Sequence, residues 1–215
     1  QQKAQAILKP EDPLHATILQ NRAVVLRSAG RLEEALADLD GVVAFHEQRN
    51  PSSSALALAY HNRAGTFRDL ERFEQALVDY RQALALMAQN PSNQRRMSSS
   101  LAGLATTLLL MGRPAEAIEP FEKALADPHP GQNQRVLAAA RWLLGRARVE
   151  AGLDPRRGMA EVRAARAELA TTEATRAELT ELDKWLAARR RWAAAHDWRG
   201  GPAPPRAPPP AGLWP

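Results

Sequence analysis

The side chains that most often carry chemistry form no catalytic or metal-binding pattern in this sequence. The five histidines are His15, His46, His61, His129 and His196, and none shares metal-ligand spacing with a second histidine or a carboxylate on one helix face. Cysteine is absent, which excludes thiolate ligands, thiol nucleophiles and disulfides. We therefore predict no catalytic residue, no metal site, no cofactor and no enzyme activity for these residues, although a longer polypeptide could add a catalytic domain.

Other residue types that could act in catalysis favour structural roles. No GxGxxG or GxxxxGK[ST] loop is present, so nucleotide binding has no predicted phosphate cradle. The acidic pairs Glu33 with Glu34 and Asp38 with Asp40 lie on amphipathic patterns, where a solvated face is the expected use of charge. The run Ser98–Ser100 has no neighbouring base in the sequence and is interpreted as the start of a helix.

Two polar residue types recur at a fixed interval and could serve binding. Asn21 and Asn62 lie 41 residues apart, and so do Arg27 and Arg68. An Asn side chain offers a donor and an acceptor to an extended peptide backbone, and an Arg side chain suits a carboxylate. The competing interpretation is that the two Asn side chains fill a polar niche between neighbouring helices.

This interval belongs to a longer internal repeat. Three segments align without gaps, NRAVVLRSAGRLEEALADL from Asn21, NRAGTFRDLERFEQALVDY from Asn62 and GLATTLLLMGRPAEAIEPF from Gly103. A degenerate fourth copy, LLGRARVEAGLDPRRGMAEV from Leu143, follows at an offset of 40 with one inserted residue near Asp154. A repeat of this length is typical of arrays built from one small structural unit.

Small residues at matching positions indicate what that unit is. They are Ala23, Ala64, Ala105 and Gly145 in the first half of each copy, and Ala35, Ala76, Ala117 and Gly158 in the second. Small side chains let two helices approach closely, so each copy is predicted to be an antiparallel helical hairpin. The predicted helices are 14–29 with 32–48, 53–69 with 72–89, 94–111 with 114–126, and 133–151 with 155–170. Glycine ends the first helix at Gly30, Gly112 and Gly152, whereas Glu71 takes this place in the second copy.

Proline-containing breaks separate these hairpins and define the predicted organisation. Residues 1–13 are interpreted as the remnant of an upstream repeat and a linker, because the chain begins at Gln1 without an initiator Met. The repeat units follow at 14–50, 51–91, 92–128 and, in degenerate form, 129–170. A helix within 171–196 is predicted to cap the array, with partner docking by Trp185 and Trp192 as the alternative. Residues 197–215 are rich in proline and glycine and are predicted to be disordered.

The repeat resembles the tetratricopeptide repeat (TPR) family in its longer form. GRLEEAL at 30–36 and GRPAEAI at 112–118 match the start of that family's second helix, while the family's Trp near the start of the first helix is replaced by Leu19, Tyr60 and Leu101. The resemblance implies an all-α fold, a right-handed α-solenoid of helical hairpins. More narrowly, the chain resembles TPR regions that follow bacterial serine/threonine protein kinases, which implies a regulatory or docking role in signalling as an alternative function.

In TPR proteins the first helices line a concave groove, and this resemblance implies a peptide-binding surface here. The corresponding residues are Gln20, Asn21, Val24, Arg27, His61, Asn62, Gly65, Arg68, Thr106 and Leu109. We therefore expect a scaffold that binds a protein or an extended peptide, with acidic partners favoured by the arginines, and no small-molecule substrate.

Net charge and hydropathy limit the predictions about nucleic-acid partners, membrane contact and location. The net charge is +5, and residues 1–126 are balanced, so the excess lies in residues 127–215. The cluster Arg189–Arg191 falls near a helix end, where cations suit the helix dipole, and nucleic-acid binding is a remote alternative. Apolar runs are too short to span a bilayer and no signal peptide is present, so a cytoplasmic location without membrane contact is expected.

Overall fold

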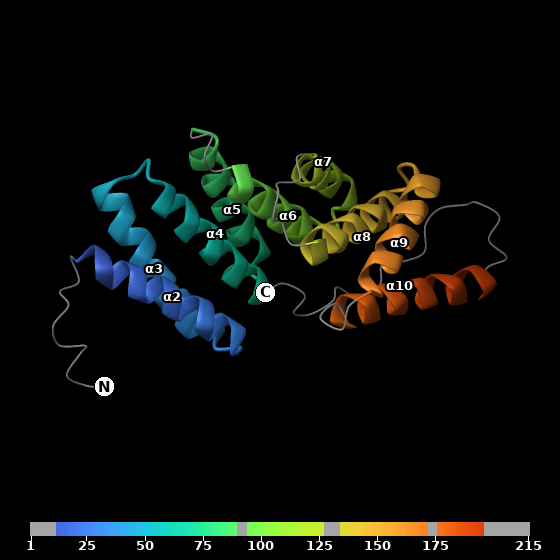
Figure 1. The fold of residues 1–215 in the computed structure, drawn as a ribbon, viewed down its shortest axis with the longest axis horizontal. Helices are drawn as coiled ribbons and strands as arrows, with labels where there is room; N and C mark the ends of the chain where they lie inside the picture. The colour runs from blue at the N-terminus through green and yellow to red at the C-terminus, as the bar shows by residue number, and fades with distance from the viewer. Residues whose placement is uncertain (1–11, 90–93, 127–133, 172–175, 196–215) are drawn as a thin grey trace. The chain divides into compact units, whose positions relative to one another are not determined.

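A computed structural model describes residues 12–89, 94–126, 134–171 and 176–195, which form nine helices and no strand (Figure 1). The helices are α2 (Pro13–Ser28), α3 (Leu32–Arg49), α4 (Ser54–Asp69), α5 (Phe73–Met87), α6 (Gln94–Leu110), α7 (Pro114–Leu125), α8 (Gln134–Ala151), α9 (Pro155–Leu169) and α10 (Arg176–Ala195). The predicted helices are therefore confirmed, with ends that differ by a few residues. Residues 1–11 of the predicted remnant and linker (1–13), His196 at the end of the predicted capping segment and the predicted tail at 197–215 lie outside the described residues, as do residues 90–93, 127–133 and 172–175.

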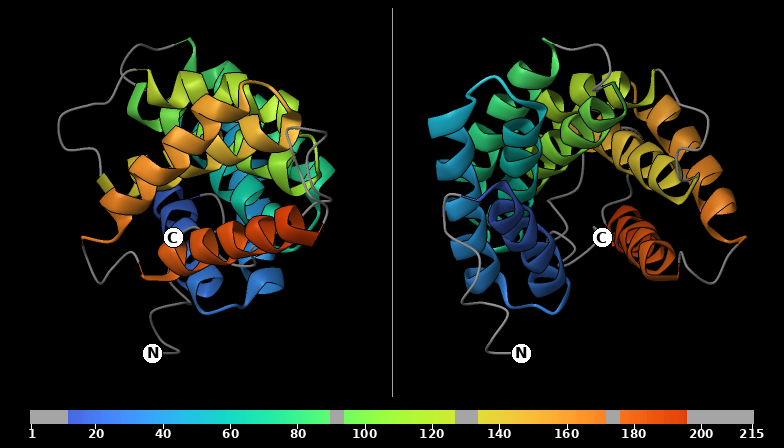
Figure 2. Two further views of the ribbon diagram at one scale, coloured as in Figure 1. Left: turned by 90° about the vertical axis from the view of Figure 1, so that its right-hand side faces the viewer. Right: turned by 60° about the vertical axis from the view of Figure 1, so that its left-hand side comes forward.

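The chain divides into two compact units. Helices α2 to α5 and the part of α6 up to Ser100 form the first unit, and the part of α6 from Leu101 onward forms the second with α7 to α10. Successive helices pack as hairpins, α2 with α3 and α4 with α5 in the first unit and α8 with α9 in the second (Figure 2). The all-α helical repeat array is thus confirmed.

The small repeat residues lie where the two helices of a hairpin cross. Ala23 and Ala35 are 1% and 0% exposed, and their counterparts in the second and third hairpins are equally buried. The fourth hairpin is tighter, because a Cβ atom added to Gly145 would lie 2.6 Å from the carbonyl oxygen of Gly158. Glycine at both positions therefore permits a backbone approach that alanine would block.

The turns inside the hairpins use a left-handed residue. Gly30, Gly112 and Gly152 have φ of 75°, 72° and 70°, and Glu71 adopts the same conformation with φ of 58°. Asp154 also has a positive φ, 52°, and its side chain accepts a hydrogen bond from the Arg157 N–H at the start of α9. The glycine-to-Glu71 exchange predicted from the repeat therefore preserves the turn conformation and places a side chain in a disfavoured region.

One acidic residue is buried against the expectation for its face. Asp38 is 6% exposed and accepts a hydrogen bond of 2.6 Å from Nε of Arg22, so the prediction that it belongs to a solvated face is wrong. Its neighbour Asp40 is exposed, as predicted. Burial of Asp38 is possible because Arg22 on α2 supplies the compensating charge and two donors.

Apolar side chains are also exposed on α2, which is the first helix that the structure describes. Ile18 is 44% exposed and Val25 is 65% exposed, whereas their repeat counterparts on α4, Ala59 and Thr66, are both 0% exposed. The α4 positions are covered because α4 packs against the hairpin that precedes it. Among the described helices, none is both long enough and apolar enough to cross a membrane.

Candidate functional site

Eight of the ten predicted binding residues lie on α2 and α4, two first helices that contact each other in the first unit. They are Gln20, Asn21, Val24 and Arg27 on α2, and His61, Asn62, Gly65 and Arg68 on α4. On α2, Asn21 is exposed and Val24 is 54% exposed, so both are available to a partner. On α4, Asn62 is half-buried and Gly65 is buried.

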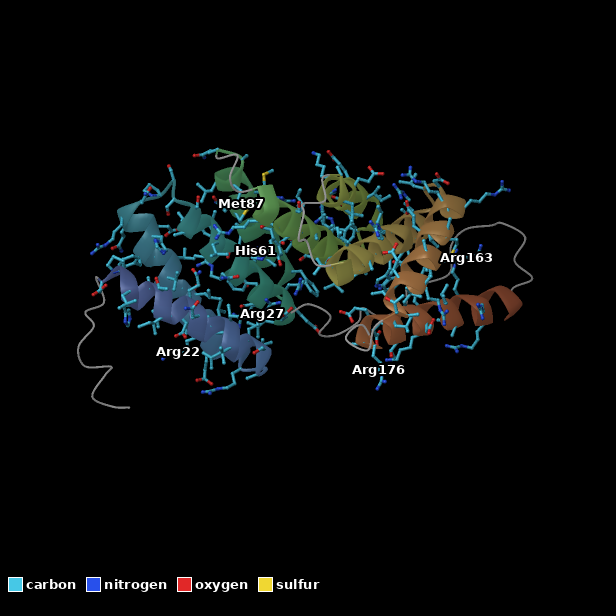
Figure 3. All side chains as sticks on the ribbon, in the orientation of Figure 1. Arg22, Arg27, His61, Met87, Arg163 and Arg176 are labelled. Atoms are coloured by element: carbon cyan, nitrogen blue, oxygen red, sulfur yellow. The ribbon has the colours of Figure 1, made fainter. Side chains whose placement is uncertain are left out.

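Arg27 crosses from α2 to α4 (Figure 3). Its Nε donates a hydrogen bond of 2.6 Å to Oδ2 of Asp69. Its guanidinium also lies over Gly65, where an added Cβ atom would come within 3.1 Å of Nη1. The absence of a side chain at Gly65 therefore makes room for Arg27, and these two predicted site residues form one contact.

Arg68 shares the same carboxylate. It is 6% exposed, and its Nη2 donates a hydrogen bond of 2.9 Å to Oδ1 of Asp69. One carboxylate thus binds two guanidinium groups, so one positive charge remains in excess at this point. The sequence-based prediction included both arginines and missed Asp69, whose counterpart in the first copy is Ser28.

His61 lies between three helices. Its Nδ1 is 2.9 Å from Oγ of Ser100 on α6, and its ring meets the edge of Tyr80 on α5 with centroids 5.8 Å apart. Burial, followed by the positive charges of Arg27, Arg68 and Arg96, lowers the pKa of His61 to about 4. The imidazole is therefore neutral at neutral pH.

The serine run differs from its prediction. Ser100 lies well inside α6, which begins at Gln94, and His61 is its hydrogen-bond partner, so the prediction of a helix start without a neighbouring base is wrong. The base comes from α4, which is distant in sequence. Ser100 is 0% exposed and also contacts the sulfur of Met87 at 3.6 Å, so this pair ties α4 and α5 to α6 and presents no nucleophile to solvent.

The last two predicted residues lie on α6 in the second unit and are buried. Thr106 is 8% exposed and its hydroxyl donates a hydrogen bond of 2.8 Å to the carbonyl oxygen of Ala102, and Leu109 is 4% exposed. The fourth-copy counterparts of Gln20 and Val24 are Trp142 and Arg146 on α8. The prediction did not include these two residues, although extending the repeat register to the fourth copy would have found them.

The second unit contains a hollow of about 440 Å³, and the ion pairs in its wall hold helices together. Arg148, 3% exposed, lies in its wall and donates hydrogen bonds to Glu122 of α7 and Glu161 of α9. Arg148 on α8 therefore links three helices. Within the described residues, no group of three or more metal-ligating side chains is close enough to hold an ion.

Two family models match the chain, both described as tetratricopeptide repeat, at residues 15–50 and 55–127. No curated protein sequence matches it. The solved structures that it resembles include BtubC (BKLC) from P. vanneervenii, with a TM-score of 0.66 and 23% identity over 75% of this chain. The match spans 65% of the length of BtubC.

Two further solved structures cover more of the chain. A putative kinesin light chain from Podosopora anserina with nearly identical TPR-like repeats has a TM-score of 0.62 and 18% identity, over 89% of this chain and 94% of that one. YrrB, described as a TPR protein with an unusual peptide-binding site, has a TM-score of 0.54 and 19% identity, over 87% of this chain and 84% of that one. At these identities the likeness concerns the fold alone.

Proposed function

Because the chain belongs to the tetratricopeptide repeat family, we propose that it is a protein-interaction scaffold whose first unit binds an acidic peptide or protein segment along α2 and α4. The scaffold role follows from the family and from a fold made of hairpins. The acidic partner follows from the charges of the first unit. Attachment to a bacterial serine/threonine protein kinase stays a prediction of the sequence resemblance.

The observation that carries the proposal is the gathering of positive charge around His61. Arg27, Arg68 and Arg96 come from three successive first helices, and each lies close enough to lower the pKa of His61. Asp69 binds the first two of these arginines, and Arg96 is exposed at the surface. An excess of cations on one surface attracts acidic partners and speeds their association.

The same surface offers contacts that do not depend on charge. Asn21 is exposed on α2 and can donate and accept hydrogen bonds with a peptide backbone. Val24, one turn further along α2, is 54% exposed and can contact an apolar side chain. We assign Asn21 and Val24 to contacts with the backbone and an apolar side chain of the partner, and the exposed Arg96 to its acidic groups, while Arg27 and Arg68 add positive potential from their places beside Asp69.

The test uses three fluorescently labelled decapeptides of glutamate, glutamine and lysine, titrated against the full chain by fluorescence anisotropy. The glutamate peptide should bind at least about tenfold more tightly than the glutamine peptide, and its affinity should fall with added salt, because charge steers this contact. Equal affinity for the glutamate and glutamine peptides would refute an acidic partner.

Variants locate the binding surface. Arg27→Gln combined with Arg96→Gln should weaken binding of the glutamate peptide by about tenfold or more, because it removes two charges from this surface. Arg31→Gln combined with Arg113→Gln is the matched control, since it also removes two charges and each arginine pairs with a glutamate three residues later at the surface. Equal losses in the control and in the first double variant would show a non-specific charge effect and contradict the assigned surface.

A further inference from the structure

On helix α8, the side chain of Trp142 lies beside an ion pair between Arg146 and Glu150. Trp142 is 1% exposed, and Nε of Arg146 donates a hydrogen bond of 2.7 Å to Oε1 of Glu150. The Arg146 guanidinium lies 5.8 Å from the centroid of the Trp142 ring. In the repeat register Trp142 and Arg146 hold the positions of Gln20 and Val24, two residues on the proposed binding surface of α2.

These residues contact a helix that has no second helix of its own among the described residues. Figure 2 shows α10 as a single helix after the α8–α9 hairpin. The Trp185 indole N–H donates a hydrogen bond of 2.9 Å to Oε1 of Glu150. Its ring meets Trp142 at 66° with centroids 5.8 Å apart, and Trp185 is 6% exposed. Trp185 therefore faces α8 and not a partner in solution.

The docked face of α10 follows helical spacing. Glu178, Leu182 and Trp185 are 3%, 0% and 6% exposed, and Arg189, one turn further, lies 5.6 Å from the centroid of the Trp185 ring. Lys184 lies on the opposite side, with a side chain that is 67% exposed. This pattern of anchors at i, i+4 and i+7 is how an amphipathic helix binds a surface of another protein.

Outside this face, α10 is weakly attached. It packs much less extensively against α9 than α8 does. The ion pair between Arg166 of α9 and Asp183 of α10, 2.6 Å long, has side chains that are 49% and 42% exposed. Exposed ion pairs contribute little to stability because water and salt screen them. The position of α10 therefore depends mainly on Leu182 and Trp185.

We propose that the α8 tryptophan site, formed by Trp142, Arg146 and Glu150, binds a tryptophan-bearing amphipathic helix of a partner, and that α10 is the chain's own occupant of it. A partner helix must displace α10. Its apparent affinity is therefore reduced by the fraction of molecules in which the site is open. The inference rests on the proposed function only in treating first helices as binding surfaces.

The probe for this site is a labelled synthetic peptide of residues 176–191, titrated against the full chain by fluorescence anisotropy. Leu182→Ala should release α10, because it removes one of the two buried side chains on which the position of α10 depends, and it should tighten peptide binding by about tenfold or more. Trp185→Ala in the chain should have the same effect through loss of the indole contacts. Circular dichroism reports whether each variant stays folded.

Controls make each outcome decisive. Lys184→Glu changes the exposed side of α10 and should leave binding at the wild-type level, and a peptide with Ala in place of Trp185 should lose at least about tenfold in affinity. If folded Leu182→Ala protein binds the peptide no better than wild type, α10 is a permanent cap and the proposal is wrong, even if Trp185→Ala unfolds. The acidic decapeptides and Arg27 play no part here, so either proposal can fail alone.

Discussion

Arg63 of α4 holds Asp79 of α5 through two hydrogen bonds, from Nε to Oδ2 at 2.6 Å and from Nη2 to Oδ1 at 3.0 Å. Asp79 is 3% exposed, so the pair lies inside the second hairpin. Arg22 and Asp38 form the same pair in the first hairpin, 41 residues earlier. In the third copy both partners are replaced together, by Leu104 and Pro120. In the fourth copy the arginine position is Leu144, and the acidic position is Glu161, which accepts a hydrogen bond from Arg148 instead.

The joint replacement predicts how this ion pair responds to mutation. Arg63→Leu should lower the free energy of unfolding by about 3–5 kcal/mol, because it leaves the Asp79 carboxylate buried without its partner. Adding Asp79→Ala should recover much of this loss, since no buried charge then remains. Urea denaturation of the two single variants and the double variant measures the coupling. Additive losses would show that the two side chains act independently.

The repeat period was sufficient to predict the hairpins, and the reason is steric. Ala23 with Ala35 marks a helix crossing wherever it recurs, because close packing demands small residues at both positions. Gly30 likewise marks a turn, since its φ of 75° favours glycine. Such requirements are local or strictly periodic, so a single sequence displays them.

The site could be predicted only in part, because its polar partners come from different helices. Arg27 and Arg68 are visible as a repeat, but their shared carboxylate, Asp69, is replaced by Ser28 in the first copy and Leu110 in the third. In the fourth copy Glu150 holds this position and pairs with a different arginine, Arg146. The partner of Ser100 is His61, 39 residues away. Pairings of this kind depend on how neighbouring hairpins stack, and no spacing within one copy encodes them.

Replacing either of two helical glycines by alanine should change the free energy of unfolding, in opposite directions for the two positions. Gly158→Ala should lower the free energy of unfolding by about 1–3 kcal/mol, because the new methyl group would lie 2.6 Å from the carbonyl oxygen of Gly145. Gly41→Ala on α3 is the matched control. There the nearest atom, Cδ1 of Leu19, is 3.6 Å away, so alanine should stabilise the chain by about 0.5–1 kcal/mol. Chemical denaturation distinguishes the two, and a stabilising Gly158→Ala would contradict the close crossing of α8 and α9.

The turn of the second hairpin can be relaxed. Glu71 has φ of 58°, which costs a residue with a side chain about 1 kcal/mol or more. Glu71→Gly should therefore raise the melting temperature, and thermal unfolding followed by circular dichroism measures the change. Gly30→Ala introduces the same strain at φ of 75°, with no atom within 4 Å of the new methyl group, and should lower it. Matching shifts in one direction would disprove a role for backbone conformation.

Stability should fall in mild acid because of His61. Burial and the charges of Arg27, Arg68 and Arg96 lower the pKa of His61 in the folded chain to about 4, from 6.5. Between these two pH values the unfolded chain binds the proton more strongly, so the free energy of unfolding decreases as pH falls from about 6.5 to about 4, by at most about 3 kcal/mol. Burial also lowers the pKa of His46, which titrates in any variant. Urea denaturation at several pH values should therefore show a steeper loss in the wild type than in His61→Gln, and parallel curves would place the acid sensitivity elsewhere.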